Sequence, residues 1–180
     1  MKLIAAGTAI ACPHLYLEGT ERQPENPVKE KTPNPDAWNH AACYTFGYNP
    51  SLLAHRVHDA MTMITMMKNH PQKKPTRIIL AGSGPVAAAA AMALKDVIDG
   101  ACIDTQGFRF ATLKDQYAPH FIPGAVKYGD VPGLLGLCAP LKLSVLGETA
   151  LPGVHASYTA NAATQKLSIT ETSGAEALVN

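Results

Sequence analysis

The stretch Arg77-Ile78-Ile79-Leu80-Ala81-Gly82-Ser83-Gly84-Pro85 decides the fold class of this chain. A β-branched run meets two glycines and a proline, residues that end a strand sharply. Residues 86–97 then have the composition of a buried helix, and a second apolar run ends on a carboxylate at Asp104. The pattern predicts a strand, a tight turn, a helix and a second strand that pairs in parallel with the first.

Further apolar patterns continue this alternation along the chain. We expect strands over residues 3–12, 141–146 and 166–170, and helices over residues 53–67, 131–137 and 153–163. Asn49 is expected to cap the first of these helices, with Pro50 at its first position, and Ser173 to cap a short terminal helix. The sequence therefore predicts a single α/β domain over residues 1–180, with three layers and a mostly parallel sheet of about five strands.

A polar segment over residues 18–39 interrupts the pattern with Pro24, Pro27, Pro33 and Pro35. So much proline excludes a helix or an inner strand. Loops of this length are usually functional or disordered, and in an enzyme this one would cover the cleft and select the substrate.

Composition and charge exclude several classes of protein. Fifteen Lys and Arg residues balance 14 Asp and Glu residues, so no overall field attracts nucleic acid or an anionic membrane. No apolar run reaches the ~18 residues of a membrane span. Met1-Lys2 with residues 3–12 resembles a short lipoprotein signal, which leaves export open, but a buried strand in a cytoplasmic protein is the favoured interpretation. The cysteines are widely spaced and are expected to be reduced core thiols: Cys12, Cys43, Cys102 and Cys138.

Ser83 is the first candidate site residue, because it lies between the predicted strand and helix with a glycine on each side. A nucleophilic serine uses such a turn, and the N–H of Gly84 would then stabilise an oxyanion. A plain helix cap by Ser83 is the competing interpretation. The nucleophile pattern is also imperfect, because Pro85 stands where a small residue is typical.

The same turn matches a dinucleotide fingerprint through Gly82, Gly84 and Ala87, with Asp104 about 20 residues further on. In that interpretation the glycines approach a pyrophosphate and Asp104 binds a ribose hydroxyl. The unit lies in the middle of the chain rather than at its start, which weakens this hypothesis.

In a hydrolase, Ser83 would need a base and an acid. His155 is the candidate base, and Asp104 or Glu148 would orient it. Each has a simpler interpretation: an exposed helical histidine for His155, and turn carboxylates for the other two. His55 and His58 could share a helix face but lack a third ligand, so we predict neither metal nor cofactor.

Several runs between about residues 43 and 148 carry a family resemblance. They are residues 44–49 (Tyr-Thr-Phe-Gly-Tyr-Asn), 53–59 (Leu-Ala-His-Arg-Val-His-Asp), 104–110 (Asp-Thr-Gln-Gly-Phe-Arg-Phe), 121–128 (Phe-Ile-Pro-Gly-Ala-Val-Lys-Tyr) and 134–140, followed by a strand that ends at Leu146-Gly147-Glu148. The chain resembles the α/β-hydrolases, in the acetylxylan-esterase-like and dienelactone-hydrolase-like branch. The resemblance implies a partial α/β-hydrolase fold and hydrolysis of a small carboxylic or acetyl ester by acyl transfer.

The departures from this family bear on function. The family's opening strands, with half of the oxyanion hole, are expected to be missing upstream of Met1. Ala150 stands where the family usually has an aspartate, and residues 170–180 contain no histidine. Only Ser83 matches a catalytic position, so the triad is expected to be incomplete. The alternative function is a noncatalytic hydrolase-fold scaffold, and an open sheet edge predicts a homo-oligomer in either case.

Overall fold

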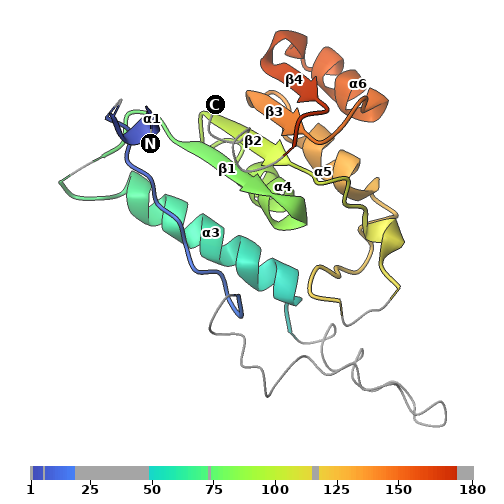
Figure 1. The fold of residues 1–180 in the computed structure, drawn as a ribbon, viewed down its shortest axis with the longest axis horizontal. Helices are drawn as coiled ribbons and strands as arrows, with labels where there is room; N and C mark the ends of the chain where they lie inside the picture. The colour runs from blue at the N-terminus through green and yellow to red at the C-terminus, as the bar shows by residue number, and fades with distance from the viewer. Residues whose placement is uncertain (1, 6, 19–48, 73, 115–117, 174–180) are drawn as a thin grey trace.

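A parallel four-stranded sheet organises the molecule, with the strands in the order β1-β2-β3-β4 (Figure 1). The computed structural model describes residues 2–5, 7–18, 49–72, 74–114 and 118–173. The strands are β1 (Ile79–Ser83), β2 (Gly100–Asp104), β3 (Leu143–Leu146) and β4 (Leu167–Thr170). The α/β class and the parallel pairing are therefore confirmed, with four strands in the described part of the chain instead of about five.

The helices form one layer against this sheet. They are α3 (Leu52–Lys68), α4 (Gly84–Ala93), α5 (Asp130–Leu137) and α6 (Pro152–Ala160), with short helical segments at α1 (Lys2–Ala5), η2 (Phe110–Thr112) and η3 (Thr164–Lys166). Each of the last three α-helices connects neighbouring strands, and right-handed crossovers in one direction place such helices on one face. The four long helices pack side by side from α3 to α6. Among the described residues no helix layer covers the second face, so the three-layer arrangement is not confirmed.

The core lies between the sheet and the helix layer. Three strand residues and three helix residues at its centre have no exposed surface: Ile103, Leu143, Val145, Ala88, Leu135 and Val154. The strand members come from alternate positions of β2 and β3, as expected when one face of each strand is turned to the helices. Because the core uses the helix-facing side of the strands, the opposite face of the sheet is the one left for other contacts.

Strand β1 shows what that second face looks like. Ile79, Ala81 and Ser83 are exposed, while Leu80 and Gly82 are partly buried on the helix side. Ile79 is 47% exposed. A Cβ built on the neighbouring Gly100 would lie 3.2 Å from its Cδ1 atom, so both residues share the face away from the helices. At β1 this face is therefore open in the described molecule.

The strand predicted over Leu3–Cys12 is wrong. Residues 2–5 form α1, and residues 7–12 are irregular. Ile4 and Ile10 are 59% and 60% exposed, and Cys12 is exposed rather than a core thiol. An apolar run becomes a strand only where a neighbour pairs with its backbone, and periodicity cannot show whether one exists.

The N-cap of helix α3 lies two residues after the predicted one. Ser51, and not Asn49, is its N-cap, and its hydroxyl accepts a hydrogen bond from the Ala54 N–H at 3.2 Å. A serine hydroxyl at this position satisfies one of the free N–H groups of the first turn. The proline-rich segment, Cys43 and the terminal helix expected after Ser173 lie outside the described residues. In the part of the chain that the structure describes, no helix is long and apolar enough to cross a membrane.

Candidate active site

No loop residue separates strand β1 from helix α4. Ser83 is the last residue of β1, and Gly84, the first of α4, has a φ of +68°. This left-handed φ is the point at which the chain reverses, and it is easily adopted only without a side chain. A Cβ on Gly82 would lie 2.9 Å from the Cβ of Ala87, so the strand and helix are in close contact. Gly82, Gly84 and Ala87 thus have a structural reason to be small.

Ser83 has extended backbone angles of −121° and 158° and an exposed side chain. Its position in β1 directs that side chain to the face away from the helices. The hydroxyl forms no cap bond with α4, so the helix-cap interpretation is wrong. Its hydroxyl also has no hydrogen bond to a histidine anywhere in the described ranges.

Asp104 is the residue beside Ser83 in the sheet register, and it is only 1% exposed. Its carboxylate accepts hydrogen bonds from the Gln106 N–H at 3.0 Å and from the Ser173 hydroxyl at 2.9 and 2.7 Å. Through Ser173 it holds the chain that leaves β4 across the end of β2. These contacts give Asp104 a structural role at the carboxyl edge of the sheet.

Glu148 lies at the same edge, two residues beyond β3, and it is 9% exposed. Its two carboxylate oxygens accept hydrogen bonds from Arg109 at 2.7 and 2.8 Å, and the Thr105 hydroxyl donates to one of them at 2.6 Å. The hydrogen bond from Arg109 is the main reason that the pKa of Glu148 is lowered, and the same bond raises the pKa of Arg109. The ion pair joins the loop after β2 to the loop after β3.

His155 lies in the first turn of α6 and is exposed. Its ring has no hydrogen bond within the described residues, and its backbone carbonyl accepts one from Thr159. The structure therefore brings Ser83 next to Asp104 but links neither of them to His155. His55 and His58 are exposed on α3, and no cluster of three metal-binding side chains occurs in the described part of the chain.

The sequence did not predict the three residues that donate hydrogen bonds to the carboxylates at this edge: Thr105, Arg109 and Ser173. A signal for two of them exists, because a strand that ends in Asp-Thr is followed four residues later by an arginine. Which carboxylate that arginine meets depends on the loop after β3, which is 39 residues further along the chain.

The dinucleotide hypothesis finds little support in this geometry. Dinucleotides bind in the crevice where the strand order reverses. The four described strands follow one another in sequence order, so they contain no such reversal. Asp104, which would bind the ribose, is buried and holds Ser173 instead.

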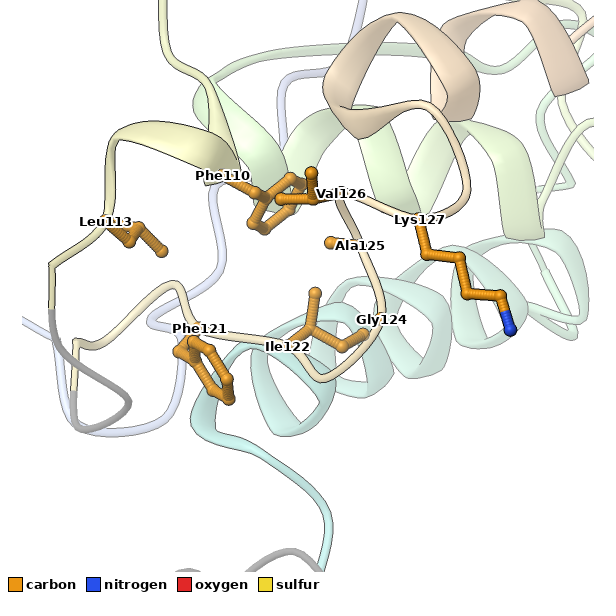
Figure 2. A pocket seen from close by; sticks show the side chains of 8 residues that line it. All are labelled: Phe110, Leu113, Phe121, Ile122, Gly124, Ala125, Val126 and Lys127. Carbon is orange, nitrogen blue, oxygen red and sulfur yellow. The ribbon is translucent and has the colours of Figure 1, made fainter.

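A small apolar cavity lies in the loop between β2 and α5, the loop that also contains Arg109. It has a volume of about 110 Å³ and is lined by Phe110, Leu113, Phe121, Ile122, Gly124, Ala125, Val126 and Lys127. In Figure 2 the Lys127 ammonium extends away from the apolar side chains. The cavity therefore presents an apolar wall without a charged group aimed into it.

No protein-family model, curated protein or solved structure matches this chain. The resemblance to the α/β-hydrolases thus stays a hypothesis that depends on the motifs alone.

Proposed function

We propose that this chain is a noncatalytic scaffold of α/β-hydrolase design. The observation that carries the proposal is the position of Gly84. In a nucleophile elbow the serine itself occupies the sharp strand-to-helix turn, which exposes its hydroxyl above the sheet. Here the residue with the positive φ is Gly84, which has no side chain. A Cβ built there meets nothing within 4 Å, so a serine side chain would have room at this position, although the left-handed φ would strain it.

Ser83 does not take the place of a serine at position 84. Its side chain lies one residue earlier, in extended backbone on the open face of β1. The two carboxylates that could orient a base already bind Ser173, Arg109 and Thr105. Activation of a serine requires a base within hydrogen-bond reach and a third group that orients the base.

The proposal includes a partial α/β-hydrolase fold with three layers. Parallel sheets occur almost only with both faces covered. A four-stranded parallel sheet with helices on one face is what a partial hydrolase fold would contain, with the second helix layer completing the three-layer design. The resemblance between residues 43 and 148 supports this assignment.

An active-site label tests the proposal directly. Purified protein is incubated with a fluorophosphonate probe and, separately, with short-chain p-nitrophenyl esters. We expect no labelling and no hydrolysis above the buffer blank. The variant Ser83→Ala should be indistinguishable from the wild type in both assays.

Labelling that disappears in Ser83→Ala would overturn the proposal and favour the ester-hydrolase hypothesis. The variant Gly84→Ser provides a matched control, because it places a hydroxyl at the pivot itself. Since none of the described residues positions a base there, we expect this variant to remain inactive as well.

A further inference from the structure

The inference concerns the segment Leu15–Glu18, called here the N-terminal turn, which lies beside helix α3 (Figure 1). The Glu18 N–H donates to the Leu15 carbonyl at 3.0 Å, which is the hydrogen bond that closes a β-turn. Leu17, at the third position of this turn, has a φ of +53°. Turns with a positive φ at the third position favour glycine, so leucine is an uncommon residue there.

Arg56 of α3 binds the backbone of the turn. Its guanidinium donates to the Tyr16 carbonyl through Nε and to the Leu17 carbonyl through Nη2, both at 3.0 Å. Its Nη1 atom lies 3.3 Å from Glu18 Oε1, so the same side chain also pairs with the carboxylate of the turn. Arg56 is only 6% exposed. Hydrogen bonds from a charged donor are stronger than those between neutral groups, so Arg56 is the main anchor of the turn.

Two other side chains of α3 contact the same turn. Asp59 Oδ2 accepts a hydrogen bond from the Tyr16 N–H at 2.8 Å, and the His55 ring lies 5.2 Å from the Tyr16 ring between centroids. Asp59 follows His55 by four residues and Arg56 by three, spacings that place side chains on one face of a helix. This face of α3 therefore presents a donor, an acceptor and a ring to a single turn.

The site does not depend on the side chain at the third position of the turn. Leu17 contributes its carbonyl to Arg56 and stays 36% exposed. A glycine would supply the same carbonyl and would adopt the positive φ without a steric penalty. The α3 face therefore fits a turn with glycine at the third position better than it fits the turn that occupies it.

We propose that this face of α3 is a recognition site for a β-turn with the sequence tyrosine, glycine, glutamate in a partner protein. The partner's tyrosine ring packs on His55 and its N–H binds Asp59, while two carbonyls and the glutamate bind Arg56. The N-terminal turn fills the site in the free chain and acts as an internal competitor. A segment tethered in the same chain competes at an effective concentration on the order of millimolar, so a partner binds by displacing it.

Fluorescence anisotropy with a labelled peptide tests the proposal on the full chain. The peptide has the sequence of residues 13–18 with Leu17→Gly. In the protein, the variant Leu17→Pro empties the site, because proline cannot adopt a positive φ. We expect this variant to bind the peptide at least about tenfold more tightly than the wild type, in which the tethered turn has to be displaced.

Matched controls identify the contacts. Arg56→Gln, added to Leu17→Pro, should abolish binding, whereas His58→Gln, at an exposed position of the same helix, should leave it unchanged. The peptide that keeps leucine should bind about tenfold more weakly than the glycine peptide, because of the cost of the left-handed conformation. Tighter binding of the leucine peptide would assign the site to the chain's own turn, in the same or a second copy, and refute the inference.

Nuclear magnetic resonance on the wild type avoids any effect of a substitution on folding. At millimolar glycine peptide, the amide signals of Tyr16 and Glu18 should move to those of a released segment. Signals that stay in place, together with no binding to a Leu17→Pro protein that retains its circular dichroism spectrum, would overturn the proposal. Equal affinity for the wild type and for Leu17→Pro would place the peptide elsewhere on the molecule and would also overturn it.

Discussion

At the scale of single residues, the ion pair between Glu148 and Arg109 is a bidentate, charge-assisted contact at the carboxyl edge. Removing one partner of a buried pair leaves the other charge without compensation. Because Arg109 is 28% exposed, we expect Glu148→Gln to lower the free energy of unfolding by about 2 kcal/mol at pH 7. Urea denaturation measures this difference, and Glu171→Gln, at an exposed carboxylate, is the control with the same change in charge.

The effect should depend on pH in a defined direction. The pKa of Glu148 in the folded chain is lowered from 4.5, mainly by the hydrogen bond from Arg109. Its contribution is therefore present above pH 4.5 and is lost as the pH falls through the lowered pKa. The difference between wild type and Glu148→Gln should shrink over that window. A difference that stays constant would show that the ion pair does not stabilise the fold as the geometry indicates.

At the scale of elements, the β1–α4 unit depends on the close contact between Gly82 and Ala87. A methyl group on Gly82 would lie 2.9 Å from the Ala87 Cβ, too close for unstrained packing. We expect Gly82→Ala to destabilise the protein by about 1–3 kcal/mol, measured by thermal unfolding. In α6, a Cβ on Gly153 meets nothing within 4 Å, so Gly153→Ala should instead stabilise the helix by about 0.5–1 kcal/mol. Equal effects of the two alanines would refute the packing argument.

At the scale of the whole molecule, β1 is an edge strand of the sheet that the described residues form. Its register with β2, together with the Ile78 carbonyl that accepts from Asp99, directs the N–H and C=O groups of Ile79, Ala81 and Ser83 away from β2. Free edges of this kind pair with another chain. We therefore predict a homodimer in which two β1 strands pair antiparallel around Ala81.

Light scattering on the eluted protein tests this prediction at micromolar concentrations. The variant Ala81→Pro removes the central free N–H, a change that edge strands tolerate, and it should be monomeric with an unchanged circular dichroism spectrum. The control Ala81→Val keeps the N–H and should remain dimeric. A monomeric wild type, or a dimeric Ala81→Pro, would exclude pairing through β1.

The sequence alone determined the elements whose signals are local. Residues 77–104 predicted a strand, a turn, a helix and a parallel strand, and all four are present at nearly those positions. Apolar runs, glycines and prolines act within a few residues of one another, so their pattern is readable without a structure.

Tertiary structure decided everything that depends on a distant partner. It left residues 7–12 irregular, because no described strand pairs with them, and among the described residues no helix layer covers the second face of β1. It also decided the hydrogen-bond partners of the polar side chains: Arg109 donates to Glu148, Ser173 donates to Asp104, and Arg56 donates to the backbone carbonyl of Tyr16. A carboxylate or guanidinium satisfies whichever group the fold brings within about 3 Å, and sequence spacing does not encode that distance.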